Sequence, residues 1–129
     1  MTSNKRIITF GTFDLFHIGH LNLLKRCKEY GNYLIVGVSS DELNHIKGKH
    51  SIISLKVRLE IIKSIRYVDE VFIEESLEEK NNYIHQFGAD ILIMGDDWKN
   101  KFDWVDCQVI YLERTPEISS SQLKKQLNL

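Results

Sequence analysis

Short apolar runs alternate with amphipathic segments along this 129-residue chain, and the alternation limits the folds open to it. The apolar runs are residues 6–10, 33–38, 68–73, 91–94 and 108–112. Residues 33–38, YLIVGV, are continuously apolar, which is typical of a strand covered on both faces. We therefore predict five strands. A helix lies between successive strands, except between the last two, which a loop joins.

The intervening segments carry helical periodicity. In the first, Ile18, Leu21 and Leu24 recur at helical spacing. The predicted helices are residues 16–30, 55–66, 77–87 and 118–127, whereas 39–54 is polar and predicts no element. Strands that alternate with helices form a parallel sheet covered on both sides. We expect a single α/β domain over residues 1–129, a Rossmann-like three-layer sandwich with a five-stranded parallel sheet.

Ligands of such sheets bind beyond the carboxyl ends of the strands. Polar stretches with distinctive residues follow the predicted strands at 11–20, 47–49, 95–98 and 114–121. Their common location predicts one binding site at that edge.

The most informative stretch is GTFDLFHIGH, residues 11–20, where the first strand leads into the first helix. Free N–H groups and a partial positive charge at a helix N-terminus favour a phosphate there. His17 and His20 share one helical face and can donate hydrogen bonds to phosphate oxygens. Gly19 between them leaves room for a phosphate or base to approach the backbone.

Zinc is the main alternative for this histidine pair, but it needs a third and a fourth ligand. His45, His50, His85 and the two cysteines show no such spacing. We expect no protein-bound metal site. Two histidines without a function would be the default for an isolated HxxH, and the surrounding strand, turn and glycine argue against it.

Charge and composition exclude other classes. The net charge of −1 gives no general basic field for nucleic acid or membranes. No apolar stretch approaches the roughly 20 residues that cross a bilayer, and the first residues do not resemble a targeting segment. We expect a cytoplasmic protein with Cys27 and Cys107 as reduced, buried thiols.

The stretch GTFDLFHIGH resembles the signature of the HxGH nucleotidyltransferase superfamily. Three further segments are similar to glycerol-3-phosphate cytidylyltransferases: RYVDEV at 66–71, MGDDW at 94–98, and RT…ISSS from 114 to 121. The resemblance runs from about residue 7 to 127. It implies that a phosphorylated alcohol, such as glycerol 3-phosphate, attacks the α-phosphate of CTP and releases pyrophosphate. The product would be a CDP-activated precursor for teichoic acid or capsule.

The resemblance also implies residue roles. His17 and His20 would stabilise the transition state, with Asp14 organising the site and Lys47 and Arg114 completing the catalytic set. The remaining implied nucleotide-binding residues are Thr12, Phe13, Gly19, Asp97, Trp98, Thr115, Ser119, Ser120 and Ser121. Lys47, Lys49, Arg58 and Arg66 would contact the acceptor. Mg²⁺ would arrive with CTP, without a dedicated protein cage, and the protein would be a homodimer.

The residues themselves leave several alternative roles open. Lys47 and Lys49 suit either a solvated loop or a flap over phosphates, and Arg66 with Asp69 suits a structural ion pair, a site or a subunit interface. Trp98 could simply pack. Serines 119–121 could cap a helix or cradle phosphates. Asp97 is expected to accept from the amino group of cytosine.

Pro116 and Glu117 stand where the family pattern has glycine. Proline stiffens this segment, and Glu117 adds a negative charge beside the expected phosphate cradle. We expect that side chain to turn away from the nucleotide, toward solvent, the loop lysines or a cationic acceptor.

Two other functions compete with the main one. One is a related transferase, either a cytidylyltransferase for phosphocholine or phosphoethanolamine or an adenylyltransferase. The other is a non-catalytic module, which the intact histidine pair and terminal motif disfavour. A tRNA synthetase is excluded because the chain is too short to hold an anticodon-binding region.

Overall fold

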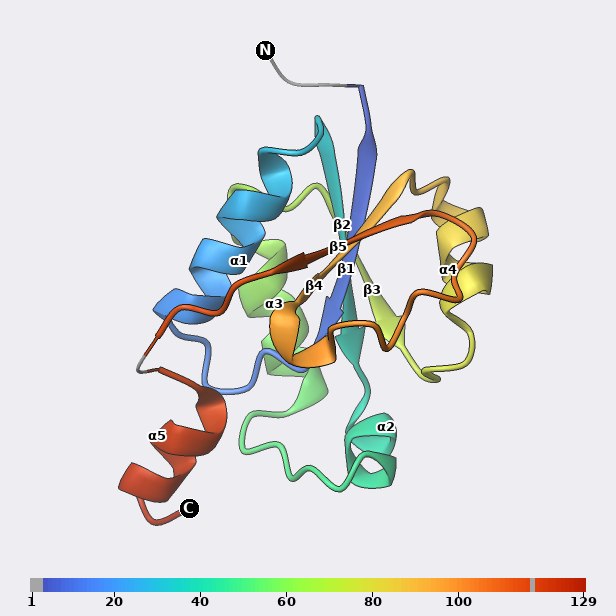
Figure 1. The fold of residues 1–129 in the computed structure, drawn as a ribbon. Helices are drawn as coiled ribbons and strands as arrows, with labels where there is room; N and C mark the ends of the chain where they lie inside the picture. The colour runs from blue at the N-terminus through green and yellow to red at the C-terminus, as the bar shows by residue number, and fades with distance from the viewer. Residues whose placement is uncertain (1–3, 117) are drawn as a thin grey trace.

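The computed structural model describes residues 4–116 and 118–129. Its five strands form one parallel sheet in the order β3-β2-β1-β4-β5 (Figure 1). The strands are β1 (Arg6–Gly11), β2 (Tyr33–Ser39), β3 (Glu70–Glu74), β4 (Ile91–Gly95) and β5 (Gln108–Leu112). This confirms the predicted five-stranded parallel sheet, with small shifts at the strand ends.

Helices cover both faces of the sheet. The helices are α1 (Ile18–Lys28), α2 (Asp41–Ile46), α3 (Leu55–Lys63), α4 (Lys80–Phe87) and α5 (Ser120–Gln126), with a 3-10 turn η1 (Asp96–Trp98). Figure 1 shows α1 and α3 on one face and α4 on the other. The predicted three-layer arrangement is confirmed. No helix in the described ranges is long and apolar enough to cross a bilayer.

Alternating residues of the central strand feed two separate cores. Ile7 packs with Leu24 and Ile62 beneath α1 and α3. Its neighbour Ile8 packs with Ile84 and Phe102 on the α4 side. Successive side chains of a strand point to opposite faces, so both faces of β1 are apolar, as its sequence predicts.

Helix α2 is an α-helix that the sequence did not predict. Ser40 caps it by accepting a hydrogen bond from the Leu43 N–H at 3.0 Å, and Asp41 and Glu42 occupy its first turn. These are ordinary N-terminal signals. The helix has only six residues and buries a single large apolar side chain, Leu43, so no helical period shows in the sequence.

The two cysteines are free, as expected. Cys27 is fully buried, and burial raises the pKa of its thiol to about 12. Cys107 is only half-buried, so the expectation of burial holds for Cys27 alone. The thiols thus offer no reactive nucleophile.

The order of the strands creates a crevice. From central β1 the chain moves outward through β2 to β3, then crosses to β4 and β5 on the other side. Between the carboxyl ends of β1 and β4 the connections diverge. Open parallel sheets bind ligands at such a switch point.

Candidate active site

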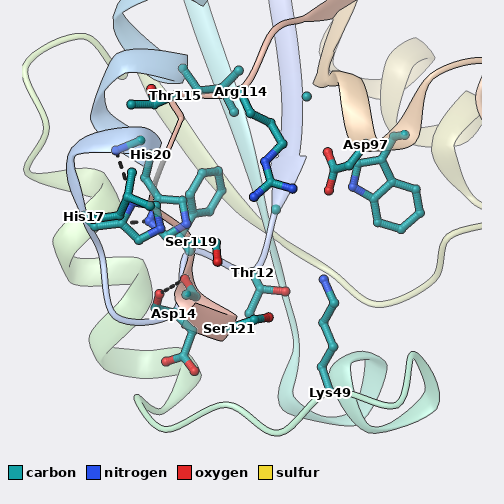
Figure 2. A pocket seen from close by; sticks show the side chains of 18 of the residues that line it. Thr12, Asp14, His17, His20, Lys49, Asp97, Arg114, Thr115, Ser119 and Ser121 are labelled. Carbon is teal, nitrogen blue, oxygen red and sulfur yellow. Dashed lines mark hydrogen bonds between the residues drawn. The ribbon is translucent and has the colours of Figure 1, made fainter. Parts of the chain in front are cut away.

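A cavity of about 780 Å³ lies at this switch point. The segments after β1, β4 and β5 line it, together with part of the loop before α3 and the start of α5 (Figure 2). It brings together most of the predicted site residues: Thr12, Phe13, Asp14, His17, Gly19, His20, Lys49, Asp97, Trp98, Arg114, Thr115, Ser119, Ser120 and Ser121. Lys47, Arg58 and Arg66 do not line it.

Residues 11–20, which we call the histidine turn, have an unusual backbone. Phe13 and Leu15 have φ angles of 55° and 49°, in the left-handed region that side chains usually avoid. Such conformations persist only where surrounding contacts impose them, and they concentrate at functional sites. The Phe13 ring is buried and meets the imidazole of His20 edge-on, with 5.4 Å between centroids.

Backbone contacts fix the tautomer of both histidines. His17, the N-cap of α1, accepts a hydrogen bond at Nδ1 from the Gly19 N–H at 3.1 Å. His20 accepts at Nδ1 from the His17 N–H at 3.2 Å. Because a backbone N–H can only donate, each neutral ring must carry its proton on Nε2.

Both imidazoles are held neutral. Burial lowers the pKa of His17, and the Arg114 charge adds to the effect. Burial, then the His17 charge, lowers the pKa of His20 to about 3. The two rings stack with centroids 3.8 Å apart. The pair therefore offers two Nε2–H donors and no formal charge near neutral pH.

The structure adds a second reason for glycine at position 19, beside the expected approach of a ligand. A Cβ at this position would lie 2.9 Å from Cε1 of His17, closer than real side-chain contacts allow. The missing side chain therefore makes room for the imidazole. Gly19 also lines the cavity, but the clash that requires glycine is internal.

Asp14 organises the site from within. Its carboxylate, 1% exposed, accepts from the N–H groups of Ile52 and Ile53 at 2.7 and 2.9 Å and pairs with Lys124 at 2.9 Å. Burial alone would raise the Asp14 pKa, but Lys124 and the two amides lower it overall. Both carboxylate oxygens are thus engaged by protein donors. Across the described ranges, no three His, Cys, Asp or Glu side chains are grouped as metal ligands.

The basic loop, residues 47–54, places its two lysines differently. Lys49 lines the cavity, and its Nζ lies 5.9 Å from the ring centroid of Trp98 across the opening. Lys47 points behind Thr12, donating to Ser39 Oγ at 3.0 Å and to Thr12 Oγ1 at 3.5 Å. Burial, then the Lys49 charge, lowers the pKa of Lys47 to about 8.

Two predicted acceptor-binding arginines lie elsewhere. Arg58 is fully buried, and its guanidinium donates to the carbonyls of Thr12 and Ser39 and pairs with Asp41. A buried charge needs such partners, so Arg58 braces the turn after β1. Arg66 is exposed and stacks on Tyr67, at the sheet edge opposite β5.

The suggested pair of Arg66 with Asp69 is wrong. Asp69 pairs with Lys28 and accepts from the Leu34 N–H at 2.8 Å, which ties α1 to β2. Asp69 therefore has a structural role in this chain.

The far side of the cavity comes from η1 and from the chain after β5. Figure 2 shows Arg114 and Lys49 extending toward the space between the histidine pair and Asp97. Ser119 caps α5 by accepting from the Gln122 N–H at 3.0 Å, and Ser120 donates to the Asp14 carbonyl. Glu117, where the sequence departs from the family pattern, lies outside the described residues.

Similarity to known proteins agrees with this geometry. The family model "Cytidylyltransferase-like" matches residues 8–126. The chain belongs to the cytidylyltransferase-like family. It is 49% identical to a glycerol-3-phosphate cytidylyltransferase of Bacillus spizizenii, over 95% of this chain and 97% of that one, and 46% identical to one of Staphylococcus aureus, over 95% of each. An FAD synthase of Thermococcus sibiricus matches at 38% identity, over 75% of this chain and 68% of that one, and an ethanolamine-phosphate cytidylyltransferase of Dictyostelium discoideum matches at 39% identity, over 74% of this chain and 27% of that one.

A solved structure supports the same fold. A lipopolysaccharide core biosynthesis protein of Thermoplasma volcanium superposes with a TM-score of 0.75 at 24% identity, covering 86% of this chain and 98% of that one. At this identity the likeness supports the architecture alone. The family match, in contrast, shows that the chain is a nucleotidyltransferase.

Sequence reasoning missed several residues that shape this cytidylyltransferase-like site. Lys80 and Glu74 form a fully buried ion pair, and Glu74 also contacts Ser39, the partner of Lys47. A lysine is seldom buried, so nothing in the sequence marks Lys80 as internal.

Two residues of α1 also escaped notice. Arg26 donates to the Glu113 carbonyl at 2.9 Å, and Asn22 donates to Thr115 Oγ1 at 3.2 Å. They lie two and six residues beyond His20 on the same helix and hold the segment that carries Arg114. No local pattern reveals these partners, since they are separated by more than eighty residues.

Proposed function

We propose that this protein transfers CMP from CTP to glycerol 3-phosphate and releases pyrophosphate. The observation that carries the proposal is the similarity of 46–49% identity, over nearly the full length of both chains, to proteins named glycerol-3-phosphate cytidylyltransferase. The geometry is compatible with it. A cavity lined by neutral imidazoles, cations and hydroxyls suits a triphosphate better than an uncharged ligand.

In the reaction, a phosphate oxygen of the acceptor attacks the α-phosphorus of CTP. One P–O bond forms, and the bond to the pyrophosphate oxygen breaks and gives its electron pair to the leaving group. No covalent enzyme intermediate is required, so catalysis depends on positioning and on stabilising charge at the phosphoryl oxygens.

Each wall of the cavity supplies part of that stabilisation. The Nε2–H groups of His17 and His20 donate to phosphate oxygens without taking up a proton. Arg114 and Lys49 add positive charge from opposite sides. Lys47 does not line the cavity, but in its charged form it adds positive charge behind Thr12, to whose Oγ1 it donates. Asp97, exposed at the rim, accepts from the amino group of cytosine, and Trp98 shapes the base pocket.

Mg²⁺ enters with the triphosphate as part of the nucleotide substrate, so the protein need only accommodate the complex. We further propose a cytoplasmic homodimer, because CTP is an intracellular substrate and β3 is an edge strand with Ile73 41% exposed. Light scattering of the purified protein tests the dimer.

A pyrophosphate-release assay tests the proposal. It crosses four nucleoside triphosphates with glycerol 3-phosphate, phosphoethanolamine, phosphocholine, pantetheine phosphate and flavin mononucleotide. We expect turnover with CTP and glycerol 3-phosphate at a kcat/KM far above every other combination. A preference for an amino-bearing phosphate would show that the acceptor is of that class and not glycerol 3-phosphate. A preference for ATP would reject cytidylyl transfer.

A further inference from the structure

The C-terminal helix α5 forms one wall of the cavity although it is poorly anchored by apolar contacts. None of its seven residues is buried. Ser120, Ser121, Lys124 and Lys125 nevertheless line the cavity. A helix that buries so little apolar surface is held by polar contacts, and local opening is easiest where such contacts dominate.

Lys124 makes the most extensive of these contacts. Its Nζ pairs with the Asp14 carboxylate at 2.9 Å and donates to the His50 carbonyl at 2.7 Å. Its side chain is 22% exposed, and the Asp14 side chain is 1% exposed. A charged hydrogen bond to a buried carboxylate is worth more than an exposed surface pair.

The same carboxylate holds the basic loop. Asp14 accepts from the N–H groups of Ile52 and Ile53, just past Lys49 and His50 in the chain. Lys124 therefore holds the loop in two ways. It donates directly to the His50 carbonyl, and it pairs with the carboxylate that accepts from the N–H groups of residues 52 and 53. Three segments far apart in sequence meet at one ion pair: the histidine turn, the basic loop and α5.

We propose that Lys124 is a positioning residue that fixes the basic loop and α5 to the histidine turn as one unit. It acts through Asp14 and His50 on the cations and hydroxyls around the triphosphate. Its ammonium is already engaged by a carboxylate and a carbonyl, so it does not itself serve as a phosphate ligand. The kinetic part of this inference rests on the proposed cytidylyl transfer, and the structural part does not.

Hydrogen exchange of the ligand-free protein tests the structural part. We compare the native protein with Lys124→Met, Lys124→Arg and the control Lys56→Met, an exposed lysine on α3. In Lys124→Met, peptides covering 47–54 and 118–129 should both exchange about five- to tenfold faster, while the sheet is unchanged. Lys124→Arg should restore much of the protection, and the control should match the native protein.

Steady-state kinetics supplies the second readout. Lys124→Met should raise the KM for CTP about tenfold and lower kcat much less, because the loosened walls must be ordered on binding. Faster exchange in α5 alone, or in neither segment, would overturn the proposal. So would a hundredfold loss of kcat with unchanged exchange, which would make Lys124 a direct phosphate ligand. If CTP is not the substrate, the exchange result still decides whether Lys124 couples the two segments.

Discussion

The two walls of the cavity are constructed in opposite ways. The histidine turn is shaped mainly by local contacts, with His17 and His20 accepting from nearby backbone N–H groups and Phe13 buried, and Arg58 adds a brace at the Thr12 carbonyl. The segment from Glu113 onward is held by residues far away in the chain, because Asn22 donates to Thr115 and Asp14 pairs with Lys124. One wall is preorganised, whereas the other depends on long-range polar contacts. We expect the first to govern kcat and the second to govern nucleotide affinity.

The largest effect should come from the histidine turn. His17→Ala or His20→Ala removes an Nε2–H donor, which should lower kcat by about 100-fold or more. His45→Ala, a change on the exposed side of α2, serves as the control and should be near native. Pyrophosphate release, measured at fixed times, gives the rates of the site variants and of the control. Near-normal rates in both site variants would make the pair structural and would remove the contrast between the walls.

Lys47 should set the alkaline limit of activity. Its pKa of about 8 means that the ammonium is lost as pH rises above that value, so the positive charge behind Thr12 falls. The kcat/KM measured over pH 6–10 should decline about tenfold for each unit above roughly pH 8. Lys47→Arg keeps its charge and should move this limit upward. A profile that stays flat to pH 10 would contradict a role for the charged form.

Asp97 tests recognition of the base on the far wall. Asp97→Asn exchanges an acceptor-only carboxylate for an amide that can also donate, so preference for CTP over UTP should shrink about tenfold. The matched change Asp103→Asn alters an exposed carboxylate that contacts Tyr111 and does not line the cavity. Preference that is unchanged in Asp97→Asn would mean that another group reads cytosine.

The smallest effect should come from residues of α1 that hold the segment after β5. Asn22→Ala removes the hydrogen bond to Thr115 and should raise the KM for CTP about three- to fivefold, with kcat within twofold of native. Initial rates against CTP concentration give both constants. A loss confined to kcat would show that this wall, too, acts in the chemical step, and the proposed division would fail.

The same contrast explains what the sequence could predict. The strand and helix pattern is local, so the parallel sheet and the edge that carries the site follow from periodicity and from the position of the motifs. Short motifs also identify many of the residues that line the cavity. The burial of Arg58 could not be predicted from the sequence. Its position in a helix between Val57 and Leu59 does not reveal that its guanidinium donates to three carbonyls and pairs with Asp41.

Residue-level roles depend on side-chain positions that only the folded chain shows. At Gly19 the sequence predicts an approach of phosphate or base, and the structure adds a further need for glycine, because a Cβ there would meet the His17 ring two residues away. Lys124 carried no signal, because its partner Asp14 lies 110 positions earlier and only the folded chain brings them together. Motifs therefore located the site, and tertiary contacts determined how its parts are held.

The state of the two imidazoles tests the account most directly. Nitrogen-15 NMR of histidine-labelled protein, with His17→Gln and His20→Gln used for assignment, reports which ring nitrogen carries the proton across pH 5–8. We predict Nε2–H tautomers for both rings at neutral pH and a His20 ring that stays neutral down to pH 5. An Nδ1–H tautomer, or a His20 pKa near the ordinary value of about 6.5, would contradict this prediction.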